Sequence, residues 1–213
     1  MPNLTTKKLS IAIIFSSLFV VLSLFPIGTI FIGGNGRFQL SIMLPPMVGW
    51  LLGPYYGIIS MVLGSIIGTF FFPSSPFGLL SFIIPATGAF FAGLNKKGIP
   101  YLTALYLAFF SFYFVVVYPS LYWFIAPHII AAIFSILLFF FSSSRVGVFL
   151  NVFSSTFAQQ ATGTILTILL LQVKTESYYM IFPLMIYERS IAIIGSFLLI
   201  LAVKNRLKSY ITL

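Results

Sequence analysis

The sequence predicts an all-α polytopic membrane protein, a bundle of about six to eight transmembrane helices in one integral membrane domain over residues 1–213. Apolar residues make up 60% of the chain and charged residues 6%, whereas soluble domains carry about 25% charged residues. Such a chain cannot cover a surface that faces water, which excludes a soluble enzyme, a nucleic-acid-binding module and a disordered tail. The apolar runs are also long and continuous, whereas a membrane barrel would show short strands of alternating polarity.

Eight apolar segments are bounded by residues typical of turns. They cover residues 8–25, 39–53, 55–72, 77–94, 100–118, 121–142, 147–172 and 181–203. A straight helix needs about 20 apolar residues to cross a hydrocarbon core roughly 30 Å thick. We therefore expect eight crossings, or six if two short segments are re-entrant or lie at the interface.

The basic residues are concentrated on one side of this eight-crossing layout. With the N-terminus in the cytoplasm, eight of the eleven basic residues lie inside: Lys7, Lys8, Lys96, Lys97, Arg145, Lys204, Arg206 and Lys208. Arg37 and Lys174 lie outside, and Arg189 lies within a segment. This bias follows the positive-inside rule and predicts a multi-pass protein of the cell membrane with a cytoplasmic N-terminus. No cleavage site followed by a soluble domain succeeds the first segment, so we expect a retained helix.

The chain lacks most residues on which membrane enzymes and metal sites depend. It contains no cysteine, no aspartate, one histidine and two glutamates. These numbers exclude thiolate sites, aspartate-bound magnesium and a His-Glu-x-x-His zinc site. We therefore expect no enzymatic activity, no cofactor and no metal. An enzyme that uses Glu188 and His128 as an acid–base pair is the catalytic alternative.

Polar side chains inside apolar segments are costly and often functional. The candidate substrate-binding residues are Asn35, Arg37, Gln39, Trp123, His128, Gln159 and Glu188. In the eight-crossing layout, most of them lie in the outer half of the membrane and Gln159 lies near its middle. This arrangement predicts a pocket that opens to the outside and is covered by the glycine-rich loop around Arg37.

Several of these residues have a plain structural alternative. Arg37 and Asn35 would otherwise belong to a solvated loop, and His128 would bond to a neighbouring backbone group. The residues Asn151, Ser155, Gln159 and Thr162 share one face of the seventh segment. Such a face either lines a cavity or joins helices through hydrogen bonds.

Glu188 and Arg189 are the two charged residues of the last segment. Glu188 shares a face with the small residues Ala192 and Gly195, so we expect it to point into the bundle. Neighbouring residues leave a helix about 100° apart, so they do not face each other. We therefore expect Arg189 to reach the outer surface, and Glu188 to bond to another helix, with His128, Arg37 or a glutamine as its partner.

The stretch from Lys8 to Phe72 resembles the start of an energy-coupling-factor (ECF) transporter S component. The resemblance rests on Gly34-Asn35-Gly36-Arg37-Phe38-Gln39-Leu40, then on Gly49-Trp50-Leu51-Leu52-Gly53-Pro54, and on a following helix with Gly57, Gly64 and Gly68. In that family the first helix often carries Ala-x-x-x-Ala, which docks on the coupling subunit. The nearest match here is Ala12-x-x-x-Ser16.

The resemblance implies a substrate-binding subunit that captures a vitamin or related micronutrient from outside. Its partners would be that small molecule, membrane lipid, a transmembrane coupling subunit and ATP-binding subunits, with Ala12 and Ser16 as docking residues. Two other functions stay open from the residues alone: a stand-alone small-molecule carrier that uses Glu188, and a non-catalytic structural or assembly protein. Arg37 and Arg189 favour an anionic or neutral solute over a cation.

Overall fold

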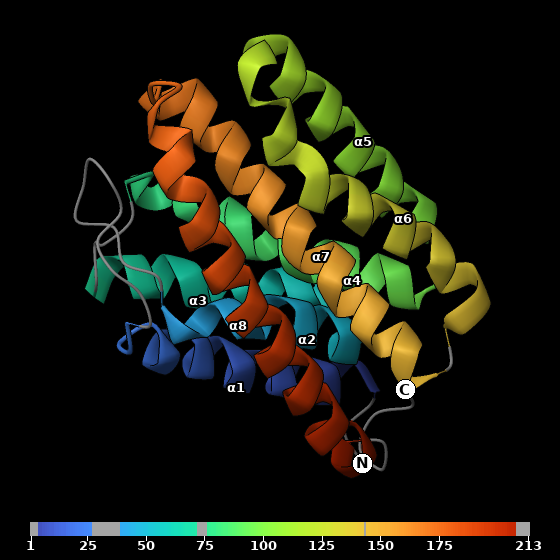
Figure 1. The fold of residues 1–213 in the computed structure, drawn as a ribbon. Coiled ribbons are helices and arrows are strands. Elements are labelled where there is room, and N and C mark those ends of the chain that lie inside the picture. Colours follow the sequence, from blue (N-terminus) through green and yellow to red (C-terminus); the bar gives the residue numbers. More distant parts are fainter. Residues whose placement is uncertain (1–3, 27–38, 72–75, 143, 208–213) are drawn as a thin grey trace.

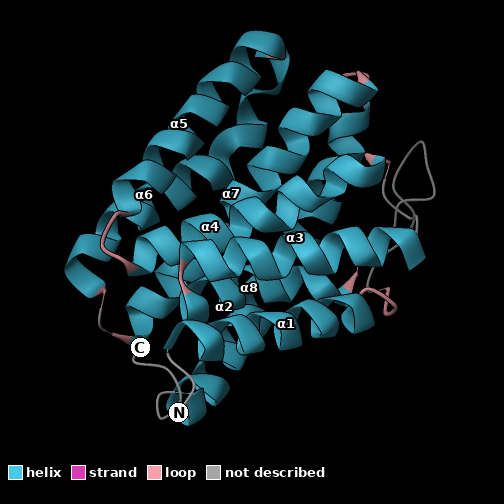
Figure 2. Cartoon of the chain, turned by 180° about the vertical axis from the view of Figure 1, so that it is seen from behind, coloured by secondary structure: helices cyan, strands magenta, loops and turns pink. Residues whose placement is uncertain are grey.

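The computed structural model describes residues 4–26, 39–71, 76–142 and 144–207, and within these ranges the chain is a bundle of helices without strands (Figures 1 and 2). The α-helices are α1 (Leu4–Leu22), α2 (Leu44–Leu52), α3 (Pro54–Phe71), α4 (Ile83–Lys96), α5 (Pro100–Val117), α6 (Ala126–Phe141), α7 (Arg145–Leu166) and α8 (Ser177–Leu207). Short 3-10 turns lead into α2, α4 and α6 at Leu40–Met43, Gly78–Phe82 and Pro119–Ile125, and a π-helical turn at Thr167–Leu171 extends α7.

Five helical segments of the described chain are long and apolar enough to cross a membrane. They are Pro54–Phe71, Gly78–Lys96, Pro100–Val117, Pro119–Phe141 and Ser177–Lys204. The prediction of an all-α multi-pass membrane protein is thereby confirmed. The apolar segment Leu40–Leu52 is shorter than these five. The number of crossings, six or eight, stays a prediction.

Proline, serine and glycine set the ends of several helices. Proline occupies the first turn of α2, α5 and α6, where its missing N–H costs no hydrogen bond. Ser144 caps α7, because its Oγ accepts a hydrogen bond from the Gly147 N–H at 3.0 Å. Gly53 ends α2 with a positive φ of 80°, a conformation that favours glycine, and Pro54 starts α3 directly after it. The sharp turn predicted between the second and third segments is therefore present.

The helices α4 and α7 lie at the centre of the bundle. α4 packs on α2, α3 and α5, and α7 packs on α4, α5, α6 and α8. α1 covers the outer side of α3, and α1 and α3 lie crosswise to α7 and α8 in Figure 1. Gly49 brings the backbone of α2 directly against the backbone of Ala89 in α4, so any larger residue there would collide with it.

α7 carries many polar side chains, and the helices that enclose it on most sides keep these side chains away from lipid. Its buried polar residues are Asn151, Ser154, Ser155, Thr156, Gln159, Thr162 and Thr164. The Asn151 amide donates to the Ala92 carbonyl of α4 at 3.1 Å, and the Thr162 hydroxyl lies 2.7 Å from the Tyr106 hydroxyl of α5. Part of the polar face thus joins helices, which is one of the two roles predicted for it.

Most basic residues of the described chain gather at one end of the bundle. Lys96 lies within electrostatic range of Lys8, which places the start of α1 beside the end of α4. The first turn of α7 and the last turn of α8, which carry Arg145 and Arg206, lie at the same lower right side of Figure 1. Lys174 lies in the turn between α7 and α8, at the opposite end. Because the charges gather in this way, the positive-inside argument applies to the folded chain, and the direction of insertion stays a prediction.

Candidate functional site

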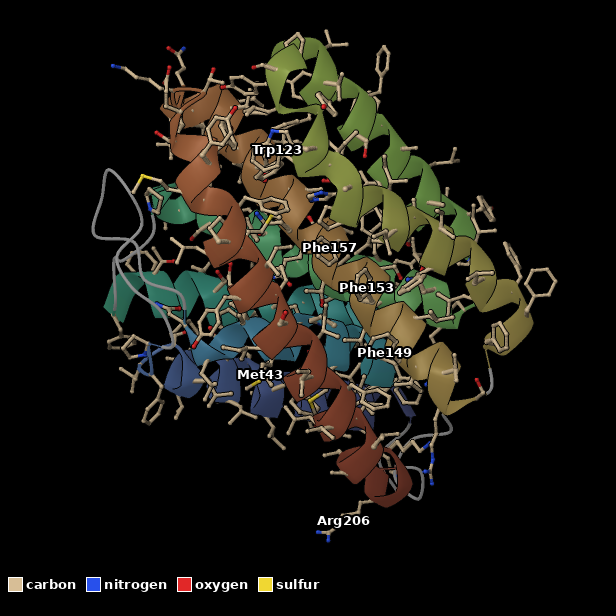
Figure 3. All side chains as sticks on the ribbon, viewed as in Figure 1. Met43, Trp123, Phe149, Phe153, Phe157 and Arg206 are labelled. Atoms are coloured by element: carbon tan, nitrogen blue, oxygen red, sulfur yellow. The ribbon has the colours of Figure 1, made fainter. Side chains whose placement is uncertain are left out.

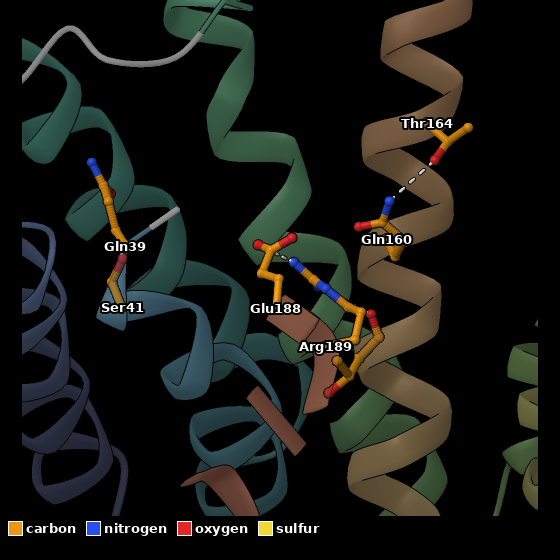
Figure 4. Close-up of polar contacts among 7 residues, drawn as sticks. Gln39, Ser41, Gln160, Thr164, Glu188 and Arg189 are labelled. Atoms are coloured by element: carbon orange, nitrogen blue, oxygen red, sulfur yellow. Dashed lines mark hydrogen bonds and ion pairs between the residues drawn. The ribbon is translucent and has the colours of Figure 1, made fainter. Parts of the chain in front are cut away.

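Glu188 and Arg189 form an ion pair inside the bundle. Arg189 Nη2 lies 2.5 Å from Glu188 Oε1, and the two residues are 3% and 4% exposed (Figure 4). Arg189 Nη1 also donates to the Thr156 carbonyl of α7 at 3.3 Å. The inward orientation of Glu188 is confirmed. The predicted outward path of Arg189 is wrong, because its long side chain bends back to the neighbouring carboxylate instead of leaving the helix radially.

Three polar atoms on Arg189 and on the turn of α7 that begins at its partner Thr156 lack hydrogen-bond partners. They are Arg189 Nε, Thr156 Oγ1 and Gln159 Oε1, all of them buried. Thr156 and Gln159 are three residues apart on α7 and therefore lie on the same side of the helix. We call Thr156, Gln159, Glu188 and Arg189 the α7–α8 polar cluster. Each unpaired atom costs roughly 1–3 kcal/mol when buried, so the cluster is costly to keep without a binding partner.

Two other helices enclose Gln159. A Cβ atom at Gly88 of α4 would lie 2.7 Å from Gln159 Oε1, and it would also contact Pro45 of α2 at 3.2 Å. Because Gly88 has no side chain, the Gln159 amide has space to pack against α4. Gln160 leaves α7 about 100° from Gln159, and its amide donates instead to Thr164 Oγ1 at 3.4 Å (Figure 4).

His128 is fully buried among aromatic rings. Its ring centroid lies 4.6 Å from that of Phe110, 6.1 Å from Phe124 and 5.3 Å from Phe157. Neither imidazole nitrogen makes a well-formed hydrogen bond, although the backbone of Phe124 lies close. The guanidinium of Arg189 is within electrostatic range of this ring. His128 therefore lies in an apolar wall, within electrostatic range of the α7–α8 polar cluster.

This aromatic wall continues along two helices. Phe149, Phe153 and Phe157 follow one another along α7 at four-residue spacing, and the last of them contacts His128 (Figure 3). Trp123 is partly buried and packs edge-on against Phe182 of α8, with 5.0 Å between ring centroids. Trp123, a predicted substrate-binding residue, thus faces α8, and its role in binding stays a prediction.

The predicted cover of the site is only partly described. Asn35 and Arg37 lie outside the described residues. Gln39 is half-buried and its amide oxygen lies 3.5 Å from Ser41 Oγ, at the start of the Leu40–Met43 turn (Figure 4). This turn packs on α8, where Ser196 donates to the Met43 carbonyl at 2.5 Å. The sequence thus brings the end of the first loop next to the helix that carries Glu188.

Ala12 and Ser16, the predicted docking residues, pack against α3. Ala12 is 1% exposed, and its carbonyl accepts a hydrogen bond from Ser60 Oγ at 2.8 Å. The Ser16 carbonyl lies against Gly64, so close that a Cβ there would be 2.8 Å away. The small residues of α1 therefore join two helices of this chain, and they are not exposed to a partner in this structure.

Thr156 and the pairing of Arg189 were not predicted from the sequence. For Arg189 a signal was present: a buried charge needs a partner, and Glu188 is the one other charged residue of its segment. For Thr156 there was no signal. Threonines in apolar helices commonly bond to a carbonyl of their own helix, as Thr162 does to Ala158 at 3.1 Å.

The comparisons with known proteins give one relative and no function. No family model matches the chain, and no solved structure matches it. It is 29% identical over 187 residues to an uncharacterized protein of Methanocaldococcus jannaschii, in a match that covers 81% of this chain. The chain spans 63% of that relative's length. Any function must therefore be argued from the residues of the site.

Proposed function

We propose that the chain is the solute-binding membrane subunit of an importer of the ECF kind, and that it binds its solute at the α7–α8 polar cluster. The observation that carries the proposal is the set of unpaired polar atoms on Thr156, Gln159 and Arg189. In a membrane protein such atoms are costly and mark sites of function more often than sites of packing. A small polar solute would supply the missing partners.

The charge of the cluster favours a neutral solute. Glu188 and Arg189 neutralise each other, so the cluster has no net charge to offer. Its unpaired atoms include a donor, Arg189 Nε, an acceptor, Gln159 Oε1, and a hydroxyl that serves as either. A solute with both donors and acceptors on one edge matches this set. An anion would compete with Glu188 for Arg189. We therefore propose a neutral, vitamin-sized micronutrient as the solute.

Irregular helix geometry supports entry of the solute from the end opposite to the basic residues. Pro183 interrupts the hydrogen bonding of α8 five residues before Glu188. At the same end, α7 finishes in the π-helical turn Thr167–Leu171, followed by Gln172 with a positive φ of 46°. Irregular turns of this kind occur often at functional sites, because neighbouring helices can part there at low cost.

The first test is native mass spectrometry of the protein purified from its own host in mild detergent. We expect a stoichiometric small molecule on the wild type, lost in Gln159→Leu and retained in Gln160→Leu. The two substitutions are matched, because they change neighbouring glutamines that leave α7 about 100° apart, the first buried with an unpaired oxygen and the second half-buried and bonded to Thr164. An empty wild type, or equal retention by both variants, would overturn the proposal that this cluster binds the solute.

The stand-alone carrier is the second candidate, because Glu188 is a buried carboxylate in a candidate membrane-spanning helix. Uptake of the co-purified molecule into cells separates the two mechanisms. An ECF-type subunit should lose uptake when the ATP-binding subunits are deleted, while binding persists. Uptake that continues without those subunits and stops in Glu188→Gln, with Glu176→Gln as control, would favour the carrier.

A further inference from the structure

Two lysines at the end of α4 lie over aromatic rings that flank the turn between α2 and α3. Lys96 Nζ lies 4.1 Å from the ring centroid of Trp50, and Lys97 Nζ lies 5.1 Å from that of Tyr55. Gly93, one turn earlier in α4, packs directly on the backbone of the turn that connects α2 and α3. The two ammonium groups are therefore held in place by the fold and by the cation–π contacts.

Within the described residues, no glutamate lies near this pair of lysines. Of the two glutamates in the chain, Glu188 pairs with Arg189 and Glu176 lies exposed in the turn before α8, at the opposite end of the bundle. Lys96 is half-buried, and Lys8 is close enough to repel it. Positive charges gathered in this way favour an anion from outside the chain.

An exposed apolar stripe begins at Tyr55 and runs along α3. Tyr55, Ile59, Leu63 and Ile67 follow one another at four-residue spacing, and all four side chains are exposed. Residues at this spacing lie on one side of a helix and here span about 18 Å. α3 is long and apolar enough to cross a membrane, so the stripe leads from the lysines into the hydrocarbon layer.

We propose that Lys96 and Lys97, with Trp50 and Tyr55, bind the phosphate of an anionic phospholipid, and that one of its acyl chains lies along the α3 stripe. Lysines near a membrane surface attract anionic headgroups, and tryptophan and tyrosine settle at the level of the headgroups. A free anion would need only the lysines, whereas a lipid also covers the apolar stripe. This site lies at the opposite end of α4 from the solute entry proposed above and is independent of the solute.

The test uses the full chain in nanodiscs of equal parts phosphatidylglycerol and phosphatidylcholine, followed by native mass spectrometry of the released protein. We expect the wild type to retain phosphatidylglycerol in preference to phosphatidylcholine. Lys96→Gln and Lys97→Gln should each lower this preference about fivefold. Lys174→Gln, an exposed lysine at the other end, should leave it unchanged, and the double variant Lys96→Arg, Lys97→Arg should retain it.

Three outcomes would overturn the proposal. The wild type could show no preference between the two lipids, or the Lys96→Gln, Lys97→Gln protein could keep the wild-type preference while its melting temperature shows that it is folded. Alternatively, millimolar inorganic phosphate could displace the bound phosphatidylglycerol. That third result would show a site for a free anion instead of a lipid.

Discussion

α7 takes part in two buried polar clusters that differ in whether their atoms are paired. In the first, Asn95 of α4 donates to Ser154 Oγ at 3.2 Å and accepts from Thr103 Oγ1 of α5 at 2.5 Å. We call these three residues the Asn95 network. In the second, the α7–α8 polar cluster, three buried atoms have no partner. Both clusters are buried and both include residues of α7, so burial alone does not mark a functional residue.

The difference shows what each cluster does for the fold. A paired polar network holds helices together, because each side chain is the hydrogen-bond partner of another. Removing one side chain leaves the others without a partner. A cluster with unpaired atoms costs stability, and such a cost persists where it supports binding. The Asn95 network should therefore respond to substitution as a structural element, and the α7–α8 polar cluster as a site. The predictions below test that contrast.

The largest effect should come from breaking the ion pair. Arg189→Met leaves Glu188 buried without its partner, and removing one member of a buried pair costs roughly 3–5 kcal/mol. We expect a large drop in the thermal midpoint measured by unfolding in detergent. Arg145→Met, at the exposed start of α7, should change little.

The double variant Glu188→Gln, Arg189→Met gives the second arm of that test. It removes both charges, so it should recover most of the stability lost in Arg189→Met alone. If it is as unstable as Arg189→Met, the unpaired charge of Glu188 is not the cause of the lost stability, and the lost bond from Arg189 to the Thr156 carbonyl accounts for it. Unfolding of four proteins, the wild type, Glu188→Gln, Arg189→Met and the double variant, gives the interaction energy between Glu188 and Arg189.

The next largest effect should come from the Asn95 network. Asn95→Leu removes both bonds and leaves Thr103 Oγ1 and Ser154 Oγ with fewer partners, at a cost of about 2 kcal/mol. The thermal midpoint should fall, and the amount of co-purified solute per folded protein should not. Ser17→Ala, on the exposed side of α1, is the control for a polar-to-apolar change outside the network. Loss of solute in folded Asn95→Leu would contradict a purely structural role.

The architecture was largely predictable from the sequence, because apolar length and turn residues determine helices in a membrane. The Gly53-Pro54 turn, the break before α7 and the inward face of Glu188 all follow from local patterns. The pairing of Glu188 with Arg189 was missed, because helix periodicity alone separates adjacent residues, whereas a long side chain can bend back to the one opposite charge of its segment. The contact of Ala12 with α3 was not predictable from the sequence. Small residues at four-residue spacing permit close packing against a helix of the same chain or of a partner chain.

The third prediction separates stability from binding at one residue. Gln159→Leu removes an acceptor that has no partner in the solute-free protein, so the solute-free protein should be as stable as the wild type or up to about 1 kcal/mol more stable. The proposed solute site predicts lost binding in the same variant. Gln160→Leu removes a bond to Thr164 and should do the reverse, with slightly lower stability and intact binding. A clear loss of stability in solute-free Gln159→Leu would show that Gln159 joins helices.

The smallest effect gives the sharpest comparison, because it makes the same change in both clusters. Thr→Val keeps the shape of the side chain and removes only the hydroxyl. Thr103→Val breaks the bond to Asn95 Oδ1 and should cost about 1 kcal/mol, whereas Thr156→Val removes an unpaired hydroxyl and should shift stability by less than about 0.5 kcal/mol. Unfolding of both variants in one detergent measures the difference. If Thr156→Val costs as much as Thr103→Val, the Thr156 hydroxyl has a partner within the fold, and the contrast between the clusters rests on Gln159 and Arg189 alone.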